Sequence, residues 1–85
     1  MNGIPLKNKL AWQCRRGMLE LDVILIPFLN DFFDHLDTSQ QNTFALFLEQ
    51  ADPDIYSWIM GYSDCQDAEF KEIIVLIRDK MQVAG

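Results

Sequence analysis

The familiar catalytic motifs are missing from this sequence, and histidine, the residue most often used for proton transfer, is scarce. It contains one histidine, His35, and it lacks a glycine-rich phosphate loop, a Gly-x-Ser-x-Gly turn and a His-Glu-x-x-His pair. His35 stands in the run FFDHLD, where we expect it to cap a helix or to pair with Asp34 or Asp37. The sequence therefore predicts a protein that is not an enzyme and that has no catalytic residues.

Cysteines are also scarce. Cys14 and Cys65 do not form a Cys-x-x-Cys pair, and only His35 could join them as a metal ligand, which is too few ligands for a structural zinc site. We expect both cysteines to be reduced, semi-buried thiols, and we expect no bound metal.

Long apolar runs are absent as well. The longest, VILIPFL and IIVLI, fall far short of the roughly 20 residues that cross a bilayer. The first fifteen residues contain neither the apolar core nor the cleavage site of a signal peptide. These absences predict a cytoplasmic protein that does not insert into a membrane.

Basic residues are outnumbered by acidic ones, seven to thirteen, which gives a net charge of -6. This balance argues against nucleic-acid binding, because neutralising phosphates requires a concentrated basic surface. The charge is distributed unevenly. Residues 1–20 hold four basic residues against Glu20, a net charge of +3, whereas residues 21–85 hold three basic residues against twelve acidic ones, a net charge of -9.

Apolar residues recur at steps of three and four along most of the sequence, which is the spacing typical of amphipathic helices. Its pattern and punctuation predict five helices: over 6–16, from about 18 to 36, from about 38 to 50, between Asp52 and Gly61, and up to about 81. Pro27 should kink or break the second helix near Val23 to Ile26. Short connections then predict an all-α, compact, five-helix antiparallel bundle, a single domain over 1–85 with an ordered core over about 6–81.

Core and cap positions follow from the same pattern. A capping box of Thr38 and Gln41 should start the third helix and Asp52 should cap the fourth, while the cap of the last helix is left open among Ser63, Asp64 and Asp67. Phe32 and Phe33 cannot both point inward on one helix. The apolar stripe of the first helix is Leu6, Leu10 and Cys14, with Ala11 and Trp12 beside it. Phe32 lies on the apolar stripe of the second helix, and Phe33 is a core candidate as an aromatic residue. The other residues expected in the core are Trp12, Leu21, Leu25, Phe28, Leu36, Phe44, Phe47, Leu48, Ala51, Ile55, Trp58, Ile59, Phe70, Ile73, Ile74, Ile77 and Met81.

The run RRGMLELD joins the first two predicted helices. Arg15 and Arg16 complement the carboxyl end of the first helix, Gly17 can adopt the left-handed backbone that stops it, and Glu20 and Asp22 lie where acids favour a helix start. The same geometry would project two guanidinium groups and a carboxylate from an exposed corner, around a residue without a side chain. Both interpretations stay open, and Arg16 could pair with Glu20 across the junction.

This run and a later one, DPDIYSWIM, resemble the two recurring elements of the FAD assembly factor family. The first element is an Arg-Gly-x-x-Glu signature, and the second is an Asp-Pro-Asp turn that leads to a tryptophan three residues past an aliphatic position. Their order, spacing and the chain length agree with the family, so the resemblance spans roughly residues 7–81. Ile55 and Ile59 stand where leucine is usual, and the basic tail of the family is reduced to MQVAG.

The resemblance implies an assembly chaperone of bacterial type. It would promote covalent attachment of FAD to the flavoprotein subunit of succinate dehydrogenase, and also to that of fumarate reductase. Arg16, Gly17 and Glu20, supported by Arg15 and Asp22, would dock near the FAD that the partner carries and favour bonding of the flavoprotein's own histidine to the flavin. The factor would act as a monomer and would not bind FAD tightly by itself.

A second hypothesis is a helical protein-interaction module that acts as the antitoxin of a toxin–antitoxin pair, a label that has also been attached to proteins of this family. Its main partner would then be a membrane or cytoskeletal toxin. A pull-down that recovers the flavoprotein and no such toxin would decide between the two hypotheses.

Overall fold

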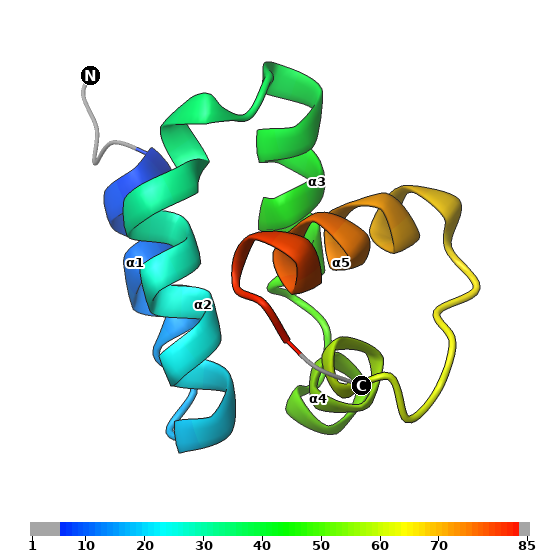
Figure 1. Ribbon diagram of the computed structural model, residues 1–85. Helices are drawn as coiled ribbons and strands as arrows, with labels where there is room; N and C mark the ends of the chain where they lie inside the picture. Colours follow the sequence, from blue (N-terminus) through cyan, green and yellow to red (C-terminus); the bar gives the residue numbers. More distant parts are fainter. Residues whose placement is uncertain (1–5, 84–85) are drawn as a thin grey trace.

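Five α-helices and one 3₁₀ turn make up the part of the chain that the structure, a computed structural model, describes, which is residues 6–83 (Figure 1). In chain order they are α1 (Leu6–Cys14), α2 (Leu19–Phe32), η1 (Phe33–His35), α3 (Thr38–Phe47), α4 (Asp52–Met60) and α5 (Ala68–Lys80). No strand occurs within these residues, so the predicted all-α class and the five predicted helices are confirmed. Within the same residues no helix is long and apolar enough to span a bilayer.

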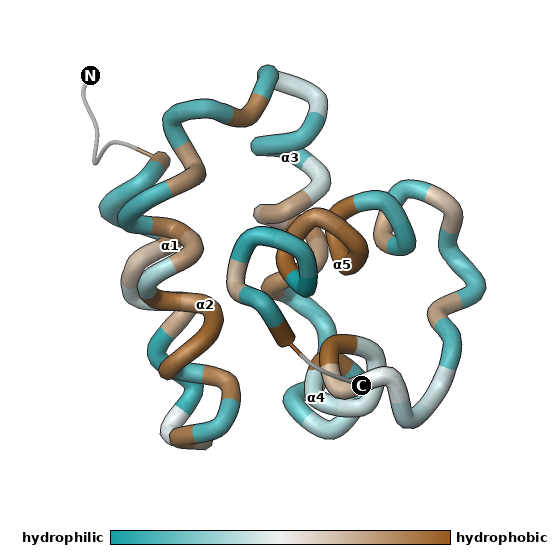
Figure 2. The backbone as a smooth tube through the Cα atoms, in the orientation of Figure 1, coloured by the Kyte–Doolittle hydropathy of each residue, from teal (hydrophilic) through white to brown (hydrophobic). Residues whose placement is uncertain are grey.

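The helices form a pair, α1 with α2, and a second group built around α5. α1 and α2 lie side by side and run in opposite directions, joined by the short turn at residues 15–18 (Figure 1). α5 packs against α3, α4 and α2 and so connects the two groups. Figure 2 shows that α2 and α5 carry the most continuous apolar stretches. Their apolar residues supply much of the common core.

Aromatic side chains from several helices meet in this core. The ring centroids of Phe28 and Phe44 lie 5.4 Å apart, and those of Phe47 and Phe70 lie 5.7 Å apart, edge to face. Aromatic pairs at such separations add about 0.5–1.5 kcal/mol beyond the burial of their area. The buried apolar residues are Leu10, Cys14, Leu21, Leu25, Phe28, Leu29, Phe33, Leu36, Phe44, Phe47, Leu48, Ile55, Ile59, Cys65, Ile73, Ile74 and Ile77.

Several residues predicted for the core do not lie there. Trp12 is 76% exposed, and Ala51 is exposed because α3 ends at Phe47, earlier than predicted. Phe32 is half-buried, whereas its neighbour Phe33 is buried at the start of η1. The tighter 3₁₀ spacing explains why a 3.6-residue pattern selects the wrong member of this pair. Three more predicted core residues are half-buried against the core: Trp58, Phe70 and Met81.

α2 continues through Pro27, so of the two predicted alternatives, a kink or a break, the break does not occur. Proline has no N–H, and the carbonyl of Val23 therefore loses its partner within the helix. The Val23 side chain is 57% exposed, which puts this stretch of backbone on the solvent side of α2. Water can supply the missing hydrogen bond there, and the helix need not end.

The capping box of α3 lies one residue before the predicted pair of Thr38 and Gln41. Asp37 Oδ1 accepts from the backbone N–H of Gln40 at 2.7 Å, and Gln40 Oε1 accepts from the backbone N–H of Asp37 at 3.0 Å. Asp37 thus begins the helix, and Thr38 is its first residue.

The starts of α4 and α5 also involve aspartates, in different ways. Asp67, one of the three candidates, caps α5, because its Oδ1 accepts from the backbone N–H of Phe70 at 3.0 Å. α4 begins at Asp52 with Ala51 in the cap position, and no side chain caps it. The predicted capping role of Asp52 is therefore wrong, and its carboxylate serves another purpose.

Candidate functional site

The turn between α1 and α2, which we call the Gly17 elbow (residues 15–18), is open at its centre. α1 ends at Cys14, before the predicted end at residue 16. Gly17 has a φ of +76°, the left-handed backbone that was predicted for it and that glycine adopts without steric cost. A Cβ added to Gly17 would meet no atom within 4 Å. The elbow therefore presents a short stretch of accessible backbone.

Arg16 folds back from the elbow onto the turn between α3 and α4. Its Nε donates to Asp52 Oδ1 at 2.6 Å, its Nη1 to the Leu48 carbonyl at 2.6 Å and its Nη2 to the Gln50 carbonyl at 2.8 Å. The side chain of Arg16 is only 12% exposed. A planar guanidinium suits this arrangement, because it can donate in several fixed directions at once. Arg16 thus joins the two turns.

These contacts correct two predictions. Arg16 does not pair with Glu20 across the junction, and its guanidinium does not project outward. Its ionic partner is Asp52, 36 residues away in sequence. The two runs that carry the family resemblance, RRGMLELD and DPDIYSWIM, therefore meet in space through this one ion pair.

Asp22 holds the same elbow from the other side. Its Oδ1 accepts from the backbone N–H of Arg16 at 2.9 Å, and the residue is half-buried. Because the backbone of Arg16 is fixed by Asp22 and its side chain by Asp52, the residue before Gly17 has little freedom to move.

Arg15, Gly17 and Glu20 are the predicted site residues that remain exposed. The guanidinium carbon of Arg15 lies 5.9 Å from the ring centroid of Trp12, in a cation–π contact. Within residues 6–83 no ion pair neutralises Arg15 or Glu20. The five predicted residues thus divide into three that another molecule can touch and two, Arg16 and Asp22, that hold them in place.

A pair of tyrosines lies close to Glu20. The ring centroids of Tyr56 and Tyr62 are 5.8 Å apart, with the rings edge to face, and Tyr62 is 72% exposed. The pKa of Tyr56 is raised, first by the negative charge of an ionised Tyr62 and to a smaller extent by Glu20. The carboxylate of Glu20 thus lies close enough to Tyr56 to disfavour its ionisation.

Both cysteines are buried. Cys14 is fully buried and Cys65 is 6% exposed, so both are more buried than predicted. Removal from water raises the pKa of Cys14 to about 12, against a smaller lowering by Arg16. Its thiol stays protonated at neutral pH. Within residues 6–83 no three histidine, cysteine or acidic side chains are grouped to hold a metal ion.

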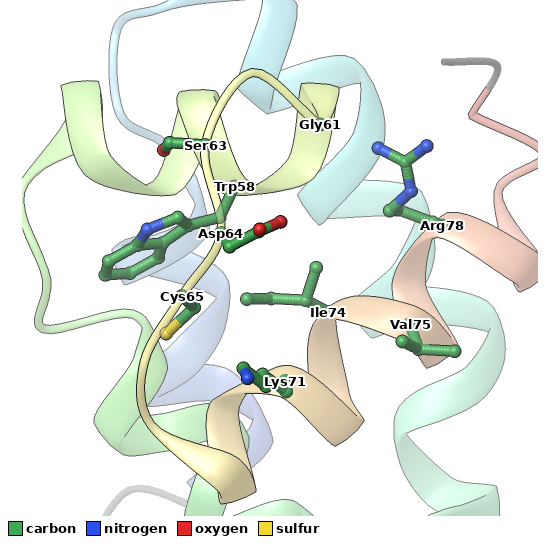
Figure 3. Close-up of a pocket in the computed structure, with 9 residues that line it drawn as sticks. All are labelled: Trp58, Gly61, Ser63, Asp64, Cys65, Lys71, Ile74, Val75 and Arg78. Atoms are coloured by element: carbon green, nitrogen blue, oxygen red, sulfur yellow. The ribbon is translucent and has the colours of Figure 1, made fainter.

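A hollow that the sequence did not indicate lies between α5 and the loop after α4 (Figure 3). It measures about 530 Å³ and mixes apolar side chains, such as Trp58 and Ile74, with the charged groups of Lys71 and Arg78. Arg78 donates a hydrogen bond to the Ile59 carbonyl at its edge. The hollow shares no residue with the Gly17 elbow.

Comparison with known proteins gives a consistent result. The family model described as flavinator of succinate dehydrogenase matches residues 8–81. A curated relative from Colwellia psychrerythraea strain 34H, named FAD assembly factor SdhE, is 44% identical over 77 residues, which cover 91% of this chain and 85% of the relative. A relative of the same name from Vibrio cholerae serotype O1 is 48% identical over 61 residues, which cover 72% of this chain and 71% of the relative.

A solved structure has the same fold. The solution structure of a protein titled UPF0350 aligns with a TM-score of 0.77 and 39% sequence identity, over 94% of this chain and 85% of the other. The helical arrangement described above is thus one that a related protein adopts in solution.

Proposed function

The chain belongs to the family of succinate dehydrogenase flavinators, and we propose that it is an assembly chaperone that binds the flavoprotein subunit of that enzyme and promotes covalent attachment of FAD. The proposal includes the flavoprotein of fumarate reductase as a second client. The bond-forming chemistry stays with the FAD and the flavoprotein, and this chain supplies binding and orientation. It does so as a cytoplasmic monomer that does not hold FAD tightly on its own.

The observation that carries the proposal is the combination of an open glycine with a fixed surround. Gly17 is exposed with empty space above it, while Arg16 is anchored to the Leu48 and Gln50 carbonyls and to Asp52. A surface that is already ordered loses little conformational entropy when it binds, so more of the contact energy appears as affinity. The elbow is thus suited to close approach by another protein.

Charge adds orientation to this contact. Arg15 presents a cation and Glu20 a carboxylate on either side of Gly17, and within the described residues neither is neutralised by an ion pair. A partner with the opposite order of charges would meet the elbow in one orientation only, because the reversed orientation places like charges together. Orientation is what a factor that positions a flavoprotein for one reaction has to provide.

The test uses cells that lack this chain and are complemented with variants. Wild-type chain should restore covalent flavin on the flavoprotein, whereas Gly17→Arg should not, because its side chain covers the elbow. Gly61→Arg controls for the strain of a side chain on a left-handed backbone, because Gly61 has a similar φ of +80° and lies outside the elbow. Its side chain must also displace Arg78, so it is the harsher change for stability, and it should still restore covalent flavin. The measurement is flavin fluorescence of the denatured flavoprotein on a gel.

Both variants need a check on folding, by far-UV circular dichroism of the purified chains. Normal covalent flavin in cells that carry only a folded Gly17→Arg chain would remove the proposal. A pull-down with the wild-type chain should recover the flavoprotein, and recovery of a toxin in its place would favour the antitoxin hypothesis.

A further inference from the structure

We propose that the outer face of α1 is a second contact strip for the flavoprotein, in which Trp12 and Arg15 bind an acidic, partly apolar segment of that subunit. The inference rests on the proposed function, because it names the chemistry that the same docking event meets beside the Gly17 elbow. We call the residues Asn8, Ala11, Trp12 and Arg15 the α1 strip; their spacing of three and four places them on one helix face.

Trp12 is the residue that draws attention to this strip. It is 76% exposed, and within residues 6–83 no large apolar side chain is more exposed. The opposite face of α1 is anchored by Leu10 and Cys14, both buried, so the helix does not need the indole to attach to the core. Tryptophan is among the residues that contribute most when they become buried in a protein interface. An indole left in water gains by contact with a partner.

The strip also has the shape of a receiving surface. Its four residues line a shallow groove of about 390 Å³ along α1, with the indole of Trp12 and the guanidinium of Arg15 on it. The guanidinium lies 5.9 Å from the indole ring, so the cation and the apolar surface are presented together. A segment that combines an acidic group with an apolar side chain can satisfy both.

Charge identifies the occupant as acidic. Lys7 is paired with Asp34 at 3.0 Å, and Arg16 is paired with Asp52. Within the described chain no carboxylate pairs with Lys9 or Arg15. Residues 21–85 carry a net charge of -9, so an acidic surface is repelled by most of the molecule and attracted to this face.

The strip is continuous with the elbow. Arg15 belongs to both, and its backbone N–H donates to the Trp12 carbonyl at 3.2 Å, which carries the last turn of α1 directly into the residues around Gly17. One partner surface can therefore cover Gly17 and Trp12 in a single docking event.

A second cation–π contact in the same molecule shows what is distinctive here. Lys80 lies 5.9 Å from the ring centroid of Phe32, the same separation as in the Arg15 and Trp12 pair. Phe32, however, is half-buried against the core, whereas Trp12 is exposed. Phe32 thus contributes to the core of the bundle, whereas the indole of Trp12 is available to a partner.

The experiment measures binding of the purified flavoprotein subunit to the full chain by titration calorimetry, at low and at physiological ionic strength. Trp12→Ala should weaken binding by about tenfold to thirtyfold. Arg15→Gln should weaken it and also reduce the loss of affinity that added salt causes. Val75→Ala removes a side chain that is 65% exposed on α5, and Lys80→Gln removes the other cation–π charge. Both controls should stay within about twofold of wild type.

Each outcome bears on the inference. Wild-type affinity for Trp12→Ala and Arg15→Gln, with no binding by Gly17→Arg, would overturn the α1 strip and leave the proposed function standing. Wild-type affinity for Gly17→Arg as well would overturn both. If Val75→Ala lost as much affinity as Trp12→Ala, binding would not be specific to the α1 strip, and the inference would fail. If added salt did not weaken wild-type binding, the partner segment would not be acidic, which would also overturn the inference.

Discussion

Two glycines with nearly the same backbone have opposite surroundings in this protein. Gly17 follows α1 with a φ of +76°, and Gly61 ends α4 with a φ of +80°. A Cβ added to Gly17 would meet nothing within 4 Å, whereas one added to Gly61 would meet the guanidinium of Arg78 at 3.0 Å. Each glycine also has an arginine close by that donates to the main chain: Arg16 donates to the Leu48 and Gln50 carbonyls, and Arg78 donates to the Ile59 carbonyl.

The difference lies in where each arginine is placed. Arg78 lies against Gly61 and fills the space that a side chain would need. Arg16 lies away from Gly17, against the turn between α3 and α4, and leaves the glycine uncovered. The two turns thus share a left-handed glycine and a neighbouring arginine, but the arginine covers the glycine only in the turn after α4. The space where a side chain would stand is therefore free for a partner at Gly17, whereas Arg78 occupies it at Gly61.

We expect the largest loss of stability from Arg16→Ala, which removes the side chain that joins the Gly17 elbow to the turn between α3 and α4. The change leaves the Leu48 and Gln50 carbonyls and the Asp52 carboxylate without the guanidinium, and we expect it to lower the free energy of unfolding by about 2–4 kcal/mol. Urea denaturation followed by circular dichroism measures this loss. Arg15→Ala is the matched control and should change the free energy of unfolding by less than about 0.5 kcal/mol, because Arg15 is exposed. Equal losses for the two variants would contradict the anchoring role of Arg16.

An alanine at each glycine compares the two turns directly. Gly17→Ala and Gly61→Ala should each lose about 1–2 kcal/mol of unfolding free energy, because both place a Cβ on a left-handed backbone. Gly61→Ala should lose about 1 kcal/mol more, since its Cβ must push Arg78 from the Ile59 carbonyl. Urea denaturation of the two variants gives the difference, and equal losses would mean that Arg78 yields without cost.

The smallest effect concerns Cys14, which lies buried just before the open turn. Burial raises the pKa of Cys14 from its ordinary value of 9.0 to about 12 in the folded chain. The folded state therefore favours the protonated thiol, and this contribution is complete below pH 9 and is lost as the pH rises from 9 toward 12. At pH 10 the loss should be about 1 kcal/mol relative to pH 8.

The matched variant for this prediction is Cys14→Ala, which cannot ionise at that position. The difference in unfolding free energy between wild type and Cys14→Ala should shrink between pH 8 and pH 10. Because every other ionisable group is present in both chains, its effect cancels in this difference. A constant difference over that range would show that the thiol is not held protonated by the fold.

Local sequence signals were enough to predict the helices and the left-handed glycine. The apolar spacing identified Leu21, Leu25 and Phe28 as core residues, and Gly17 was recognised as a helix stop. These features depend on neighbours a few residues away, so the local pattern contains the information that determines them.

The contacts of the candidate site depend on distant neighbours, and here the sequence misled. Asp52 looked like a cap for α4 because aspartate before proline commonly starts a helix, but an arginine 36 residues earlier binds it instead. Glu20 was the expected partner of Arg16 because it is near in sequence. Trp12 was expected in the core as an aromatic residue, although the spacing of Leu10 and Cys14 already marks the buried face of α1 and Trp12, two residues from each, lies off that face. The resemblance to a family identified the right stretch of chain without giving the role of each residue in it.

The ion pair between Arg16 and Asp52 has a practical consequence for exchanging parts between related proteins. Consider a chimera that takes residues through α2 from one relative and the remaining residues from another. It will keep the conformation of the Gly17 elbow only when position 52 supplies an acidic side chain within reach of Arg16. Grafting the short Arg-Gly run alone onto a different helical scaffold would transfer the motif without the Asp52 ion pair that fixes its conformation.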